Sequence, residues 1–143
     1  MKNDLRSGAV ILLALAITGC SKGGPEIVRL PTSPVTGVIH VNGEPTAMVE
    51  VSCRPDAGSS EINYAVIAVS DEDGAFKLGT YESGDGLPAG SYTLTFNWIE
   101  MGLTPKDKFK GKYANPAKSE QKFTVEGHEE EQVDLGTIEL TSK

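Results

Sequence analysis

Three acidic residues and a glycine stand in consecutive positions within "SDEDGAFKL", residues 70–78. Carboxylate oxygens are preferred calcium ligands, and a calcium ion takes about six to eight oxygen atoms, including backbone carbonyls and water. Asp71 and Asp73 are therefore candidate calcium ligands, and Asp85 from the next loop could complete a site with them. The stretch either binds calcium or only turns the chain.

The EF-hand loop tests the calcium interpretation, because its carboxylates stand at fixed positions around an invariant glycine. If Gly74 is that glycine, the first and last ligand positions fall on Val69 and Thr80, which carry no carboxylate. The pattern therefore favours a tight turn, in which Asp71 caps the backbone and Phe76 returns to the core. A calcium site of another geometry stays open as the alternative.

A long connection, residues 100–121, holds five lysines and two aromatic residues. Connections longer than about 15 residues in a compact domain are usually functional or disordered. A basic, partly aromatic surface suits an acidic polysaccharide or an acidic protein, so this is a possible binding loop. In the favoured interpretation the two aromatic residues instead hold the loop on the sandwich edge, and the lysines stay in water. The residues concerned are Lys106, Lys108, Phe109, Lys110, Lys112, Tyr113 and Lys118.

Side chains for catalysis are sparse. The chain has two histidines, His40 and His128, and two cysteines, Cys20 and Cys53. Neither histidine stands in a recognisable relay for a serine nucleophile. Two separated histidines and one free cysteine also make no zinc pattern. The sequence therefore predicts a protein that is not an enzyme and holds no cofactor other than a covalent lipid. A hydrolase or metal enzyme is the less favoured alternative.

Residues 1–19 have the pattern of an export signal, with Lys2 and Arg6 ahead of an apolar run at residues 9–17. The run is too short for a permanent membrane helix, which needs about 20 apolar residues. It ends in "ITGC", which resembles the lipobox of bacterial lipoproteins. The resemblance implies cleavage before Cys20, a diacylglyceryl lipid on its sulfur, and a protein anchored to a membrane of the bacterial envelope.

In enteric bacteria an aspartate after the lipidated cysteine retains lipoproteins at the inner membrane. This chain has Ser21 there, so the resemblance favours the outer membrane. Residues 20–34 are rich in glycine and proline, as a flexible tether is, and residues 35–143 are long enough for one domain. The net charge of −7 argues against nucleic acid or an anionic membrane as the main partner. The partners we expect are the membrane, through the lipid, and a protein or polysaccharide of the envelope.

From residue 35 onward, apolar and polar residues alternate with period two over short stretches, and no stretch keeps a helical period. In "SYTLTFNWI", for example, Tyr92, Leu94, Phe96 and Trp98 share one face. Seven such stretches predict an all-β, antiparallel β-sandwich. They cover residues 37–41, 48–54, 64–70, 75–81, 91–99, 122–127 and 132–140.

Local signals place three further features. Asn42-Gly43 predicts a type I′ turn, because both residues tolerate a positive φ. A switch of alternation at Gly136 predicts a β-bulge in the last strand. Cys53 alternates with the core residues of its strand, so we expect a buried thiol and not a nucleophile, whereas His40 is expected to be a lone exposed imidazole.

The segments "GVIHVNGEP", "SDEDGAFKL" and "PAGSYTLTF" together resemble the transthyretin-like or carboxypeptidase-regulatory-like domain. With "DKFKGKY" added, the chain is similar to small planctomycete lipoproteins that carry this domain. The resemblance implies a prealbumin-like sandwich and a non-catalytic structural or interaction module at the cell surface or in the periplasm. A purine-pathway hydrolase of the family ends in Tyr-Arg-Gly-Ser, whereas this chain ends at Lys143 without that motif.

Overall fold

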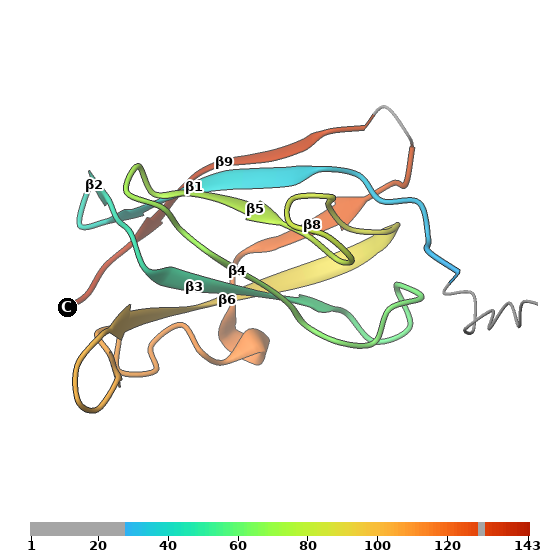
Figure 1. Ribbon diagram of the computed structural model, residues 1–143. Helices are drawn as coiled ribbons and strands as arrows, with labels where there is room; N and C mark the ends of the chain where they lie inside the picture. The colour runs from blue at the N-terminus through green and yellow to red at the C-terminus, as the bar shows by residue number, and fades with distance from the viewer. Residues whose placement is uncertain (1–27, 129–130) are drawn as a thin grey trace, which may run out of the picture.

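The computed structural model describes residues 28–128 and 131–143, so the lipobox and Cys20 lie outside the described residues. The described part is a β-sandwich of nine strands with one short 3-10 helix (Figure 1). No helix in these ranges is long and apolar enough to span a bilayer. The elements are β1 Val35–Val41, β2 Glu44–Pro45, β3 Val49–Pro55, β4 Val66–Val69, β5 Ala75–Leu78, β6 Gly90–Glu100, β7 Lys106–Asp107, η1 Pro116–Lys118, β8 Lys122–Val125 and β9 Val133–Leu140.

The strands form two sheets. In the first, β1 is central, with β5 and β2 along one edge and β9 along the other. In the second, the order is β4, β3, β6, and both β7 and β8 pair with the outer edge of β6. The prediction of an all-β sandwich is confirmed. The structure has two strands more than expected, β2 and β7, and each is only two residues long.

The expectation of a wholly antiparallel sandwich is wrong for one strand pair. β9 runs parallel to β1, from Val35 opposite Val133 to Val41 opposite Leu140. The chain crosses from the second sheet to the first after β8, so β9 starts at the same end of the sandwich as β1 (Figure 1). Alternation shows which face of a strand is buried but not which way its neighbour runs.

The core lies between the two sheets and consists of the residues that alternate inward. Tyr92, Leu94 and Phe96 are buried on β6, while Trp98 is only partly buried near the end of the strand. Cys53 on β3 is fully buried among them, as predicted. His40 does point outward, but it is half-buried and its Nδ1 lies 3.1 Å from Glu139 Oε1, so it is not a lone imidazole.

Both backbone features predicted from glycine positions are present. Asn42 and Gly43 have φ angles of 55° and 86°, which the turn between β1 and β2 requires. The register between β1 and β9 shifts between Thr36 and Val38, opposite Gly136 with φ 65°. The shift explains why the buried residues of β9 change parity along the strand.

Residues that precede Val35 also contact the sandwich. Ser33 is fully buried and exchanges two backbone hydrogen bonds with Leu87, of 2.9 and 3.0 Å. Arg29 Nη1 lies 2.6 Å from Glu82 Oε1. The end of the expected tether is therefore held against the loop that precedes β6.

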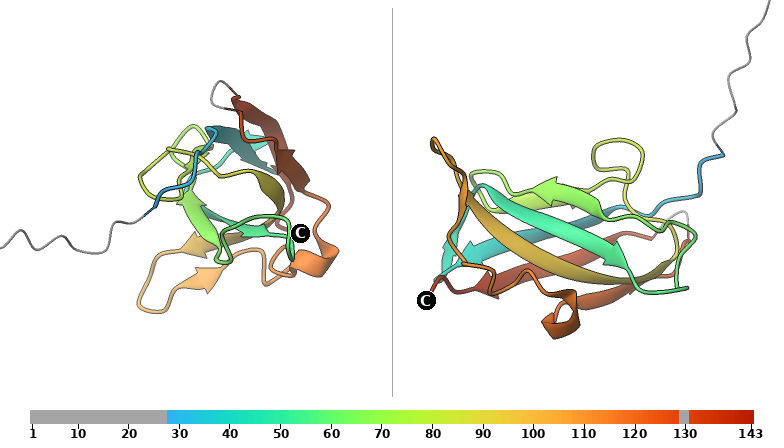
Figure 2. Two further views of the ribbon diagram at one scale, coloured as in Figure 1. Left: turned by 90° about the vertical axis from the view of Figure 1, so that its right-hand side faces the viewer. Right: turned by 90° about the horizontal axis from the view of Figure 1, so that it is seen from below.

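The sandwich has two distinct ends, visible in Figures 1 and 2. The described chain starts at one end, beside the loop that follows β5. The opposite end carries the turn between β1 and β2, the loop between β6 and β7, and the C-terminus. Whatever binds at one end is separated from the other by the length of the strands.

Candidate functional site

The acidic stretch is a turn in which the Asp71 carboxylate accepts hydrogen bonds from the backbone. Asp71 Oδ1 accepts hydrogen bonds from the N–H groups of Asp73, at 3.0 Å, and Ala75, at 2.9 Å. Gly74 has a φ of 75°, and a Cβ there would collide with the carbonyl oxygen of Ile39. Only glycine fits this position, and the predicted turn between β4 and β5 is confirmed.

Asp85 caps a different loop. Its carboxylate accepts hydrogen bonds from the N–H groups of Thr80, Tyr81 and Glu82, at 2.7, 3.1 and 3.0 Å. The Asp71 turn precedes β5 and the Asp85 loop follows it, so the three candidate calcium ligands do not converge. In the described ranges no three His, Cys, Asp or Glu side chains come together as a possible metal site.

The lysine-rich connection is built around Asp107. Its Oδ1 accepts hydrogen bonds from the N–H groups of Trp98 and Phe109, both at 2.9 Å, and its Oδ2 from Gly111, at 2.7 Å. Further along, the carbonyl oxygens of Tyr113 and Gln121 accept hydrogen bonds from the N–H groups of β6. The connection thus covers the outer edge of β6, as the edge-covering interpretation predicts.

Phe109 is only 3% exposed and belongs to the core, so it is not available to a ligand. The proposed binding role for this residue is therefore wrong. Trp98 packs against it at 5.8 Å between ring centroids. This packing agrees with the interpretation favoured from the sequence, in which the aromatic residues hold the loop on the sandwich.

The lysines of this connection do not form one uniform patch. Lys108 Nζ lies 4.3 Å from the centroid of the Trp98 ring and 3.6 Å from Glu100 Oε1. Lys112 Nζ donates hydrogen bonds to Thr141 Oγ1 and to the carbonyl oxygen of Lys143. Two others, Lys106 and Lys110, are exposed. The basic groups are thus divided between β7 with the turn after it, where Lys106, Lys108 and Lys110 lie, and the C-terminus, which Lys112 contacts.

A cavity of about 310 Å³ lies between this connection and the end of β9. Desolvation acts to raise the pKa of Tyr113, but hydrogen bonds with Thr141 and the nearby Lys112 outweigh it and lower that pKa. The cavity therefore has a polarised phenol beside ammonium and amide groups. Its polar lining consists of Lys112, Tyr113, Asn115, Lys118, Ser119, Glu120, Gln121 and Glu139.

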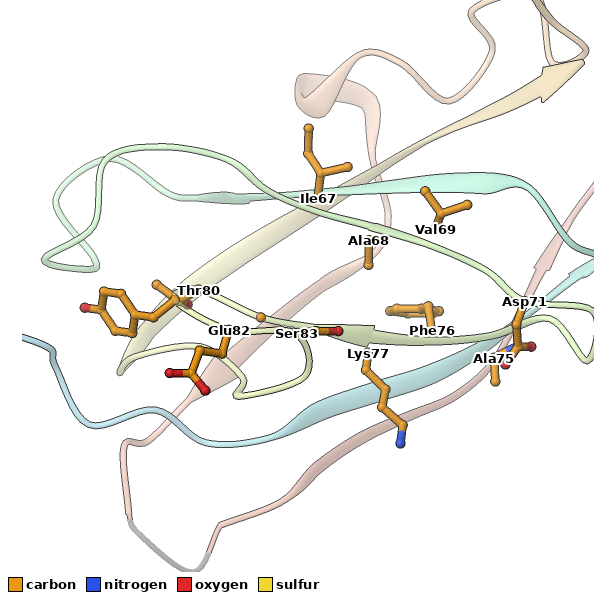
Figure 3. A pocket seen from close by; sticks show the side chains of 12 residues that line it. Ile67, Ala68, Val69, Asp71, Ala75, Phe76, Lys77, Thr80, Glu82 and Ser83 are labelled. Atoms are coloured by element: carbon orange, nitrogen blue, oxygen red, sulfur yellow. The ribbon is translucent and has the colours of Figure 1, made fainter. Parts of the chain in front are cut away.

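A larger groove, about 600 Å³, runs between β4 and β5, the edge strands of the two sheets (Figure 3). Ala68 points toward Phe76, whereas Ile67 and Val69 point away from it. Ile67 and Val69 are 59% and 52% exposed, which is high for large apolar side chains on a strand. β4 forms one wall of the groove, and β5, which carries Lys77, forms the other.

Sequence reasoning missed this groove, although a signal for it was present. The stretch "YAVIAVS" is apolar on both faces, which is typical of a strand buried on both sides or of one that exposes an apolar face. β4 is the second kind, since it lies at the edge of its sheet. The exposed Met101 and Leu103 were missed too, because they lie in a loop without periodicity.

The thiol of Cys53 also has the low reactivity of a core residue. Burial raises the pKa of its thiol far above the usual range, and the nearby Asp56 acts in the same direction. Because the thiolate is the reactive form, this thiol is inert in the folded protein.

The sequence matches no protein-family profile and no curated protein. Similar solved structures include a 9R-lipoxygenase from Cyanothece PCC8801 (12% identity, TM-score 0.41), the major pilin subunit of Bacillus cereus (19%, 0.41) and (S)-allantoin synthase (14%, 0.43). The matches cover 77 to 79% of this chain, which spans only 16, 29 and 42% of those chains, respectively.

Proposed function

We propose that this chain is a non-catalytic, lipid-anchored module of the bacterial cell envelope that acts through contacts with other molecules. The anchor is the diacylglyceryl lipid expected on Cys20, at the end of the lipobox. Ser21 favours the outer membrane. Two or three acyl chains hold a small domain on a bilayer almost permanently, since each buried methylene contributes about 0.8 kcal/mol.

The groove between β4 and β5 is the observation that carries the interaction role. Ser70 N donates to Val49 O across the β3–β4 pair, and antiparallel pairing alternates. The backbone groups of Ile67 and Val69 therefore face away from β3, toward the open edge. An open edge with exposed apolar side chains is the usual surface for pairing with another strand.

The resemblance in sequence supports the same proposal. Transthyretin-like and carboxypeptidase-regulatory-like domains, and the small planctomycete lipoproteins that carry them, are the proteins to which the quoted turn and strand segments are similar. A fold of this kind hosts many functions, so the function of this protein depends on its surfaces.

The anchor is tested by feeding cells a labelled fatty acid and recovering the protein. We expect the label on the wild type and on Cys53→Ser, and none on Cys20→Ser. Cys53 is the matched control because it is the only other cysteine. A label that persists in Cys20→Ser would refute the lipid anchor.

The contact surface is tested by placing a photo-crosslinking amino acid at Ile67 and, as a control, at the exposed Thr137 on the other sheet. We expect a discrete cross-linked species in cells from position 67 only. The product should disappear when Val69→Lys is added. Equal products from both positions would contradict a role for the groove.

A second candidate function, binding of an acidic polysaccharide, is favoured by the cavity beside Tyr113. Its phenol, amides and lysines suit sugar hydroxyls and carboxylates. Lys118→Glu should then reduce retention on an acidic polysaccharide column, whereas Lys77→Glu, in the other groove, should not. Unchanged retention of Lys118→Glu would remove this candidate.

A further inference from the structure

The loop between β6 and β7 ends in an apolar tip, which we define as residues 101–105. Leu103 is fully exposed and Met101 is 73% exposed. Every residue of the tip is exposed, and the loop protrudes from the end of the sandwich (Figures 1 and 2). The side chains of the tip therefore do not belong to the hydrophobic core.

Single exposed apolar residues are common and need no explanation. Here two large ones stand two positions apart at the end of one projecting loop. They contribute nothing to the core, and polar residues would serve such a loop at least as well. Exposed apolar groups clustered in this way mark a surface that binds a protein or a membrane.

The charges around the tip indicate which of these two partners binds there. Lys106 and Lys110 are exposed just behind the tip. Lys108 lies between them and is paired with Glu100, 3.6 Å away. The Asp107 carboxylate, also nearby, accepts backbone hydrogen bonds from Trp98 on β6 and from Phe109 and Gly111 in its own turn. Three lysines stand against the two carboxylates of Glu100 and Asp107 beside the tip, so the local net charge is positive, although the whole chain carries −7.

An apolar tip with lysines behind it matches the interface of an anionic bilayer. Leucine and methionine side chains enter the boundary of the acyl chains, while ammonium groups stay at the level of the phosphates. Each lysine near an anionic leaflet strengthens binding about fivefold. An apolar protein groove would not require the lysines.

The tip and the start of the described chain lie at opposite ends of the domain (Figures 1 and 2). β6 alone, with 11 residues, spans roughly 36 Å between them. The chain from Cys20 to Val28 reaches at most roughly 30 Å. The chain before Val28 is therefore shorter than the domain. When the strands stand perpendicular to the membrane that holds the lipid, the tip points away from that membrane.

We propose that the tip inserts into a second, anionic lipid bilayer, so that the anchored protein bridges two lipid surfaces. The bridge rests on the lipid anchor of the proposed function, whereas insertion of the tip depends only on residues 101–110.

The test uses the full lipidated protein reconstituted into donor vesicles of phosphatidylcholine. Fluorescent acceptor vesicles contain either phosphatidylcholine alone or phosphatidylcholine with phosphatidylglycerol. We expect donors to retain the anionic acceptors, and retention to fall as salt is raised. Substitution M101S with L103S should lower retention roughly tenfold or more, and K106Q with K110Q roughly 25-fold, about fivefold for each lysine.

Ile67→Ser is the matched control, because it also removes an exposed apolar side chain but lies on β4. It should leave retention unchanged. All substituted positions are exposed, so the melting temperature should stay that of the wild type and report that the variants fold.

Three results would overturn the bridge. The first is retention of anionic acceptors no greater than by vesicles without protein. The second is equal retention by the M101S and L103S variant. The third comes from an additional set of acceptors made from native envelopes: retention of that set only would assign the tip to a protein partner. If instead the protein is not recovered with the donor vesicles, the anchor fails, and the proposed function fails with it.

Discussion

Tyr113 and Phe109 pack edge to face, with 5.0 Å between their ring centroids and an angle of 84° between their planes. Phe109 lies on the inner side of this pair and Tyr113 lines the cavity beside β9. The two aromatic residues of the lysine-rich connection therefore have different tasks. One holds the connection on the core, and only the other faces a space where a ligand fits.

Replacing Phe109 with alanine should destabilise the domain by about 3–5 kcal/mol, the usual cost of removing a buried phenylalanine. The measurement is urea unfolding followed by tryptophan fluorescence, since Trp98 lies against the deleted ring. Lys106→Ala, on the same connection but exposed, should change stability by less than about 0.5 kcal/mol. A Phe109→Ala protein as stable as the wild type would mean that the ring is not in the core.

Asp85→Ala should cost about 1–3 kcal/mol, because three backbone N–H groups lose their acceptor. Asp73→Ala removes an aspartate of the other loop whose carboxylate accepts no hydrogen bond in the described part of the chain. It should be close to neutral. Calcium should raise the melting temperature of neither the wild type nor these variants, and a rise abolished by Asp85→Ala would restore the calcium hypothesis.

Glu131 should make stability depend on pH in the acid range. Desolvation acts to raise its pKa, but hydrogen bonds from the N–H groups of Glu126, Gly127 and His128 outweigh it and hold the pKa below its usual range. A carboxylate with a lowered folded pKa contributes stability above its unfolded pKa of about 4.3 and loses it as the pH falls through the folded value.

Glu131→Gln should therefore unfold at a lower temperature than the wild type at pH 7, and the two should converge as the pH falls below about 4. Glu120→Gln, at an exposed position, is the control and should follow the wild type throughout. Thermal melts across this pH range make the comparison. A constant difference between Glu131→Gln and wild type at every pH would show that ionisation of Glu131 is not the cause.

Cys53 should not react with a thiol reagent in the native protein, because its side chain is fully buried and burial raises its pKa. In denaturant, the lipidated protein should titrate with one thiol. Two thiols would mean that Cys20 carries no lipid, and rapid reaction without denaturant would mean that Cys53 is accessible. The assay therefore reports on both cysteines.

The sequence by itself determined the features that depend on neighbouring residues. Asn42-Gly43, Gly74 and Gly136 require a positive φ where they stand, and all three are turns or bulges in the structure. Alternation with period two showed which residues of β1, β3 and β6 face the core. It also predicted a sandwich, because a strand with one apolar face must bury that face against another sheet.

Only the tertiary structure decided which strands became neighbours and what faced outward between them. Alternation does not encode strand direction, so the parallel pairing of β9 with β1 was missed. It does not say that β4 ends a sheet either, so the open groove beside Ile67 was missed. The surroundings of Tyr113 were also decided by folding, because its hydroxyl accepts a hydrogen bond from the N–H group of Thr141, 28 residues away in the sequence.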